Sequence, residues 1–184
     1  MILPIYTYGN AVLRKHAEPI ASDFPALNDL VNNMYETMYK AEGVGLAAPQ
    51  VGFPIRLLVI DLAVFLEDDP ELGAFKIVMI NPIILERSEE EVSGEEGCLS
   101  IPGIHENVMR AEKIKIQYFD VDFKEHIEEF ESYKARVVQH EYDHLEGHLF
   151  TDKVTPIRRQ LLKSRLTNIV KGKTSCDYKV KTAK

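Results

Sequence analysis

Two histidines four residues apart, His140 and His144, flank Glu141 in a stretch that reads HEYDH. Residues i and i+4 lie one above the other on a helix, so both imidazole rings would point at a single ion. Such a pair is a common ligand set for zinc and related divalent metals. A glutamate beside the pair can take a proton from a water on that metal. The stretch therefore predicts a metal site with acid/base chemistry.

The class of site depends on a third ligand, and the residues after the pair do not supply one. Phe150 stands where metzincin proteases have their third histidine, and no glutamate follows Glu146 to act as in thermolysin-like enzymes. His148 comes directly after Gly147, a residue type that ends helices, so we expect its side chain to point away. We therefore expect the third ligand upstream.

Cys98 is the upstream candidate, in the stretch SGEEGCLSIPG, which we expect to be a loop that leaves a strand. A cysteine thiolate and two imidazoles form a three-ligand set that leaves a fourth position for water. A cysteine considered alone is more often a small buried apolar residue, and that alternative stays open here. Cys176 lies in a lysine-rich tail and has no comparable argument.

The spacing of apolar residues predicts the elements that position these groups. Helices are expected over residues 25–41, 133–146 and 155–172. Strands are expected over residues 55–62, 75–86, 112–122 and 125–132, the last two as an antiparallel hairpin. The last helix should bury its apolar residues, Ile157, Leu161, Leu162, Leu166 and Ile169. Strands in the middle with helices at both ends predict an α+β domain.

Three further segments are expected to be irregular. Residues 43–54, GVGLAAPQVGFP, predict a loop whose glycines permit turns that other residues resist. The insertion 63–76 predicts a surface loop, and residues 173–184 a frayed terminus. We expect one catalytic domain over residues 1–152, with residues 153–184 as a basic C-terminal helix and tail of the same domain.

The charge of the chain is unevenly distributed. Residues 153–184 carry ten Lys and Arg against one acidic residue, or +9, so a net charge of -7 leaves -16 on the other residues. A basic end could dock onto a polyanion or could only aid solubility. No secretory leader and no membrane-length apolar run is evident, and two cysteines suit a reducing compartment, so a soluble cytoplasmic protein is expected.

Three stretches together resemble the signature motifs of the peptide deformylase family. They are GVGLAAPQ at 43–50, EGCLS at 96–100 and QHEYDHLEG at 139–147, and YGNAVLR, VIDL and MINP also look like that family. The resemblance implies a deformylase-like fold, with antiparallel strands around a central HExxH helix and a helix at each end of the chain. It also implies hydrolysis of the N-formyl group from the formylmethionine of newly made proteins, which releases formate.

The resemblance also implies a role for individual residues. Cys98, His140 and His144 would bind one divalent metal, ferrous iron in this family, with zinc, nickel or cobalt able to replace it. Glu141 would be the general acid/base for the attacking water on that metal. The Gln50 side chain and the Leu99 N–H would stabilise the oxyanion. The backbone around Val44 and Gly45 would align the peptide.

The implied partners are N-formylmethionyl nascent peptides and, through the basic C-terminal helix, the ribosome, with no membrane and no DNA. The sequence departs from the family at His105, where many members carry an arginine near the peptide backbone of the substrate. Arg110 matches a family arginine that pairs with the motif glutamate, here Glu96. The alternative for Glu96 is a solvated acid in an acidic run.

Two other functions remain open from the residues alone. The same metal chemistry would serve a peptidase or amidase of different specificity. The Cys, His, His set could also be a structural zinc in a binding module, although such sites are usually closed by a fourth protein ligand that this sequence does not offer.

Overall fold

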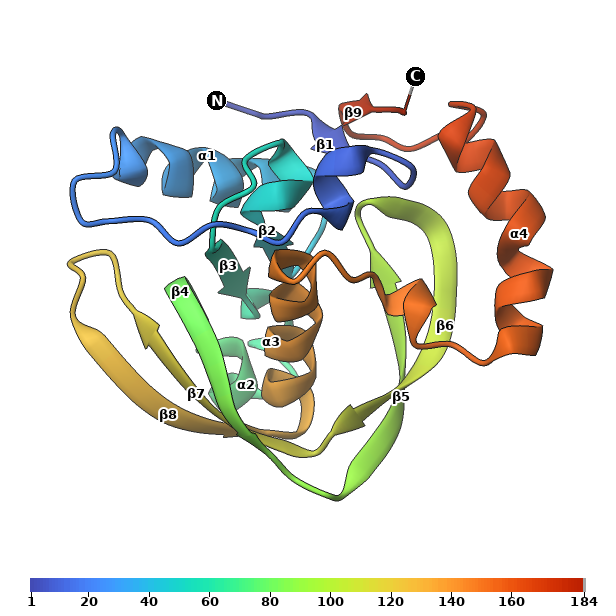
Figure 1. Cartoon of the computed structure of the whole chain (residues 1–184). Helices are drawn as coiled ribbons and strands as arrows, with labels where there is room; N and C mark the ends of the chain where they lie inside the picture. The colour runs from blue at the N-terminus through green and yellow to red at the C-terminus, as the bar shows by residue number, and fades with distance from the viewer. Residues whose placement is uncertain (184) are drawn as a thin grey trace.

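The computed structural model describes residues 1–183, which form three small β-sheets and the helices around them (Figure 1). The helices, with η for the short 3-10 helices, are η1 (Ala11–Arg14), α1 (Leu27–Lys40), η2 (Ala48–Val51), η3 (Ala63–Phe65), α2 (Pro70–Gly73), α3 (Ser132–Leu145), η4 (Phe150–Asp152) and α4 (Pro156–Val170). The strands are β1 (Ile5–Tyr6), β2 (Gly45–Ala47), β3 (Leu57–Asp61), β4 (Lys76–Arg87), β5 (Glu91–Cys98), β6 (Ile101–Ala111), β7 (Lys113–Phe119), β8 (Glu125–Glu131) and β9 (Val180–Lys181).

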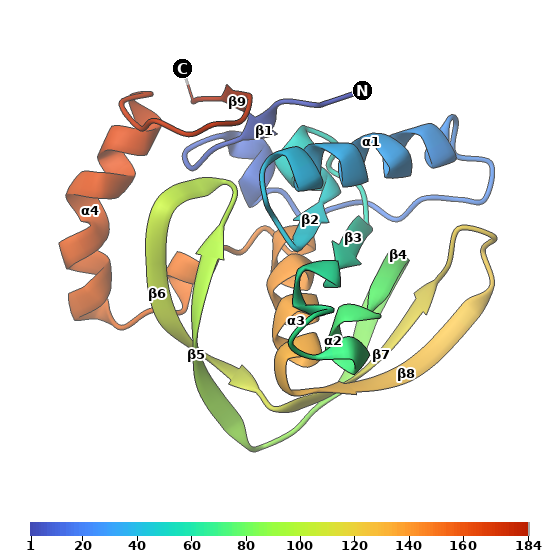
Figure 2. The same cartoon turned by 180° about the vertical axis from the view of Figure 1, so that it is seen from behind.

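The largest sheet has the order β2-β3-β4-β7-β8, and all its neighbouring strands are antiparallel. The strands β5 and β6 form a separate antiparallel hairpin. Helix α3 runs between this hairpin and the sheet, as the two opposite views in Figures 1 and 2 show. The predicted α+β class, with antiparallel strands around the HExxH helix, is confirmed.

Helix α3 is buried on nearly every side because it lies between two layers. Its apolar residues Val138 and Leu145 are inaccessible to solvent, but polar residues such as Gln139 and Asp143 are buried as well. A polar group taken out of water is costly unless it gains a partner, so the position of this helix requires a polar network on the hairpin side. That network forms one wall of the site described below.

Two further cores complete the domain. Helix α1 packs on the sheet through Met34 and Met38, and α4 packs on the β5–β6 hairpin through Leu162, Leu166 and Ile169. The expectation that α4 also buries Ile157 and Leu161 was wrong, since these residues are 73% and 64% exposed. The hairpin covers only one narrow stripe of the helix.

The predicted helices and strands are found with small shifts at their ends. Thr155 caps α4 as expected, because its side chain accepts a hydrogen bond from the Arg158 N–H. The hairpin partner β6 was not predicted. Burial alternates along this strand, but the buried face includes Glu106 and Arg110, so apolar and polar residues do not alternate over 101–111 and the sequence carried no clear strand signal.

The three segments expected to be irregular all contain regular structure. Residues 43–54 include β2 and η2, and the insertion 63–76 includes η3 and α2. The expected frayed terminus was also wrong, because β9 pairs in parallel with β1 and so joins the two ends of the chain. None of the helices within residues 1–183 combines the length and hydropathy that a bilayer crossing requires.

Candidate active site

Cys98, His140 and His144 come together where the end of β5 meets α3. One ligand atom from each lies within 4.8 Å of the others, and the Cys98 Sγ lies 3.3 Å from the His144 Nε2. The two histidine rings are 5.3 Å apart, one helical turn from each other. No further histidine, cysteine or acidic residue joins this group in the part of the chain that the structure describes. A thiol and two imidazoles with one open side are a suitable donor set for a divalent metal.

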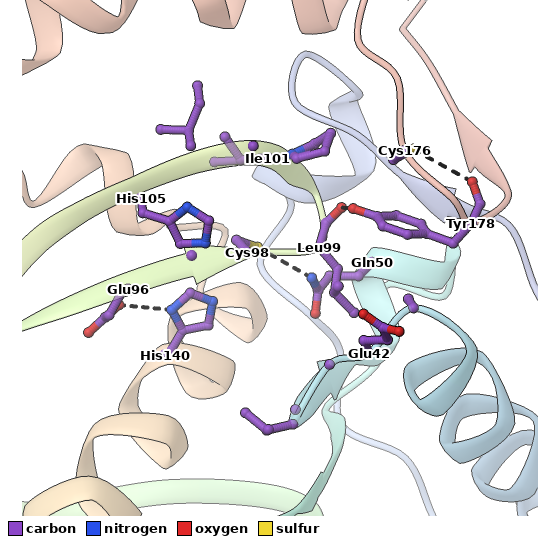
Figure 3. A pocket seen from close by; sticks show the side chains of 18 of the residues that line it. Glu42, Gln50, Glu96, Cys98, Leu99, Ile101, His105, His140, Cys176 and Tyr178 are labelled. Atoms are coloured by element: carbon purple, nitrogen blue, oxygen red, sulfur yellow. Dashed lines mark hydrogen bonds and ion pairs between the residues drawn. The ribbon is translucent and has the colours of Figure 1, made fainter. Parts of the chain in front are cut away.

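The two imidazoles differ in their hydrogen bonds and in the direction of their pKa shifts. The His140 Nδ1 donates to the Glu96 Oε2 at 2.9 Å, which leaves the Nε2 free to face the Cys98 sulfur (Figure 3). Burial opposes the protonation of His140, but the adjacent Cys98 and Glu96 outweigh it and raise its pKa. Burial lowers the pKa of His144, so that ring is neutral in the absence of metal.

Glu96 is the centre of a buried polar network behind the histidines. Its two carboxylate oxygens accept two hydrogen bonds from Arg110 and one from Arg136, each 2.9 Å long, in addition to the one from His140. Arg110 also donates to the Asp143 Oδ2 at 2.5 Å. Burial alone would raise the pKa of Glu96, but these donors hold it well below its usual range.

The predicted pairing of Arg110 with Glu96 is therefore confirmed, and Glu96 is not a solvated acid. Sequence reasoning missed Arg136 and Asp143. Asp143 lies inside the HEYDH stretch and Arg136 one turn before His140, so their helical spacing relative to the histidines was an available signal.

Glu141 lies on the other side of the histidine pair, beside β2. Its side chain is buried, and its Oε2 has no hydrogen-bond partner among residues 1–183. Burial raises the pKa of its carboxyl to about 7. The Glu141 carboxylate can approach β2 this closely because Gly45 has no side chain. A Cβ on Gly45 would lie only 2.4 Å from the Glu141 Oε1. A glycine is therefore required at this position of β2.

Two hydrogen-bond donors lie beside the Cys98 sulfur. The Gln50 Oε1 accepts from the Ala47 N–H at 2.8 Å, which directs the Gln50 Nε2 toward Cys98, 3.5 Å from the Sγ, and toward Ser100. The backbone N–H of Leu99 makes no hydrogen bond to another group in the described chain. The Leu99 N–H can therefore serve a bound molecule, whereas the Gln50 Nε2 would have to give up its contact with Cys98 or Ser100 to do so.

These groups open into a cleft of about 630 Å³. Val44, Gly45, Cys98, Leu99 and Glu141 line it, as do other residues of β5 and β6. His105 is also in the wall, opposite Gly97 on the paired strand. His144 lies beneath the floor, 1% exposed, and His148 is exposed elsewhere. The structure thus brings all the predicted site residues to one place.

One part of the wall was not predicted. The segment Ser175–Tyr178, from the tail expected to fray, also lines the cleft. Tyr178 points its hydroxyl at the backbone of Leu99, as Figure 3 shows. No pattern in residues 173–184 marks this contact, because it depends on where the two ends of the chain meet.

Comparisons with known proteins agree with this geometry. The family model described as polypeptide deformylase matches residues 2–160. The chain is 50% identical to a peptide deformylase of Christiangramia forsetii over 98% of this chain and 96% of that one. It is also 50% identical to a peptide deformylase of Flavobacterium psychrophilum, over 98% and 97% of the two chains.

Solved structures give the same result. The crystal structure of peptide deformylase from Thermotoga maritima superposes with a TM-score of 0.77 at 41% identity, over 85% of this chain and 99% of that one. A peptide deformylase from Legionella pneumophila superposes with a TM-score of 0.81 at 37% identity, over 95% and 100%. The chain therefore belongs to the polypeptide deformylase family, metal-dependent hydrolases that remove the N-formyl group from nascent peptides.

Proposed function

We propose that Cys98, His140 and His144 hold the divalent metal of this enzyme and that Glu141 is its general acid/base. The observation that carries the proposal is the arrangement of the thiol, the two imidazoles and an unpartnered carboxylate at one cleft. A divalent cation held there would lower the pKa of a coordinated water and polarise the substrate carbonyl. Thiolate and imidazole suit several metals, and we propose ferrous iron as the native one.

Glu141 can move a proton in both directions during the reaction. Its pKa of about 7 lies near neutral pH, where a general base and its conjugate acid are both available. It would take a proton from the attacking water and pass it to the departing amine. The bond between the formyl carbon and the amine nitrogen breaks, which releases formate and a free N-terminus.

Gln50 and the Leu99 N–H would stabilise the negative charge that develops on the formyl oxygen. Both donors lie beside Cys98, and the Gln50 amide is already oriented by Ala47. A donor of this kind stabilises the transition state by about 3 to 4 kcal/mol when its position is fixed before the reaction.

The backbone at Val44 and Gly45 would align the peptide. Strand β2 is the last strand of the large sheet, so one of its edges has no strand partner within residues 1–183. Val44 and Gly45 line the cleft along that element. An extended peptide can add to such an edge through main-chain hydrogen bonds, with little dependence on its side chains.

The substrate assignment is tested by formate release from formyl-Met-Ala-Ser, with acetyl-Met-Ala-Ser and the unblocked peptide as controls. We expect activity on the formylated peptide alone, because the proposed deformylase activity requires a site beside the metal that accepts the formyl hydrogen and excludes the acetyl methyl group. Comparable turnover of the acetylated peptide would indicate an amidase of broader specificity.

The ligand assignment is tested by Cys98→Ser. We expect a sharp loss of bound metal, measured after anaerobic purification with iron, because a serine hydroxyl is a much poorer ligand than a thiolate. Cys176→Ser is the matched control and should keep its metal. A Cys98→Ser protein with full metal content and activity would overturn the assignment.

We also propose that the chain acts in the cytoplasm at the ribosome, with residues 1–152 as catalytic domain and residues 153–184 as its basic extension. Lys163 on α4 and Lys171 directly after it are exposed and available to a polyanion, whereas Arg158 is paired with Glu106. Lys163→Glu with Lys171→Glu should weaken salt-sensitive ribosome binding without a change in formyl-peptide cleavage. Unchanged ribosome affinity would contradict this proposal.

A further inference from the structure

The C-terminal tail follows a fixed path from α4 to the cleft. Gly172, with a φ of +66°, lets the chain turn back after the helix ends at Val170. Residues Ser175–Tyr178 then line the cleft, and β9 follows immediately. The tail is thus held by α4 on one side of the cleft contact and by β9 on the other.

The β9 anchor is formed by backbone hydrogen bonds and by side-chain contacts at Lys181. The Ile5 N–H donates to the Lys179 carbonyl at 2.9 Å, and the Thr7 N–H to the Lys181 carbonyl at 3.1 Å. The Lys181 carbonyl also accepts from the Asn10 Nδ2 at 2.8 Å, and the Lys181 Nζ lies 3.0 Å from the Tyr6 hydroxyl. An anchor of this kind fixes the position of Tyr178, two residues before β9.

Tyr178 touches the hairpin tip that carries a proposed oxyanion donor. Its hydroxyl donates to the Leu99 carbonyl at 2.7 Å, across 79 residues of sequence. Leu99 and Ser100 form the tip between Cys98 and Ile101, which pair with each other. A phenol stays protonated at neutral pH, so this donor is always available.

The neighbouring carbonyl at the tip is held in the same way. The Ser100 carbonyl accepts from the Tyr8 N–H at 2.8 Å. Each of the two tip carbonyls is therefore bound by a residue from one end of the chain. The Leu99 side chain is also confined, because it lies so close to Gly43 that a Cβ there would be 2.7 Å from the Leu99 Cδ1.

We propose that Tyr178 is a positioning residue for deformylation, which holds the backbone of Leu99 so that its N–H points at the formyl oxygen. The inference rests on the proposed role of the Leu99 N–H. Without the Tyr178 hydroxyl, the peptide unit between Leu99 and Ser100 can rotate. The Leu99 N–H, in the preceding peptide unit, then loses its fixed direction. Small errors in the direction of a catalytic donor reduce the rate of the chemical step more than substrate binding.

The test is Tyr178→Phe, which removes one hydroxyl and keeps the ring. We expect kcat for formate release from formyl-Met-Ala-Ser to fall about tenfold, less than the loss of a whole oxyanion donor, with KM changed by less than about twofold. Tyr6→Phe is the matched control, because it removes a tail contact to Lys181 that does not touch Leu99. A purely structural role would lower the melting temperatures of both variants and leave both kcat values alike, which would overturn the inference.

A second variant separates this inference from the proposed role of Leu99. Replacement of the Leu99 N–H by an ester oxygen, with the α-hydroxy acid incorporated at that position, deletes the donor and keeps the side chain. We expect kcat to fall about a hundredfold, with no further loss when Tyr178→Phe is added. An ester variant with normal kcat would refute both the Leu99 role and this inference. A strongly impaired ester variant together with a normal Tyr178→Phe would refute the inference alone.

Discussion

The Glu96 network and the Glu141 side of the site are equally buried but differ in how their polar atoms are satisfied. Both carboxylate oxygens of Glu96 accept hydrogen bonds, from Arg110, Arg136 and His140, and Arg110 joins Glu96 to Asp143. The Glu141 Oε2 and the His144 Nδ1, by contrast, have no partner within the described chain. Unsatisfied buried groups are costly in a folded protein.

The difference suggests different roles: the Glu96 network supports the metal-binding residues, whereas Glu141 is the group proposed to take part in the reaction. A satisfied network holds its members in one geometry, so His140 is oriented before any ligand arrives. The Glu141 Oε2 has no such partner within the described chain, and burial raises the pKa of this carboxyl, as the proposed proton-transfer role requires. Variants on the two sides should therefore give different kinds of defect.

The largest effect is expected on the Glu141 side. Glu141→Gln should lower kcat for formyl-peptide hydrolysis about a thousandfold, because the amide cannot take a proton. Metal content, measured by elemental analysis, should be unchanged, since Glu141 is not among the grouped ligand atoms. Wild-type turnover by this variant would contradict the proposed proton-transfer role of Glu141.

On the Glu96 side the expected defect is in stability. Arg110→Ala removes the most buried cation of the network, with two of the hydrogen bonds to Glu96 and the bond to Asp143, which should reduce the free energy of unfolding by about 3 to 4 kcal/mol. Urea unfolding measures this, and Lys113→Ala, which breaks an exposed pair with Glu131, should cause no measurable change. Equal stability of the two variants would show that the network is not structural.

The pH dependence of the metal-free protein gives a third test. The folded-state pKa of Glu141, about 7, lies above its ordinary value of 4.5. Its contribution to stability is therefore present below pH 4.5 and is lost as the pH rises through 7. Glu141→Gln should then gain up to about 3 kcal/mol relative to wild type between pH 4.5 and pH 8. A difference independent of pH would mean that the carboxyl is not perturbed.

The smallest effect is expected where the two sides meet. Glu96→Gln weakens the acceptor that orients His140, so metal affinity should fall about tenfold in a chelator competition. Glu91→Gln, an exposed position on the same strand, is the control and should bind metal normally. If both variants bind metal as tightly as wild type, the orientation of His140 does not depend on Glu96.

The site was more predictable from the sequence than the connections around it. The geometry of the HEYDH stretch can be predicted locally, because helical spacing alone places His140 beside His144. The resemblance to the deformylase family supplied Gln50, Leu99 and the pairing of Arg110 with Glu96. Residues 43–54 were expected to be a loop because glycine usually indicates a turn, whereas Gly45 lies in a strand to leave room for Glu141.

By itself, the sequence determined the helix that carries the histidines, the identity of the groups that can bind metal and the class of fold. These depend on local periodicity and on side-chain chemistry, and both can be read directly from one amino-acid sequence. Only the tertiary structure decided which buried carboxylate is satisfied and which is left unpartnered, and that the tail reaches Leu99. Those properties arise from contacts between residues as far apart as Leu99 and Tyr178, and no local pattern encodes them.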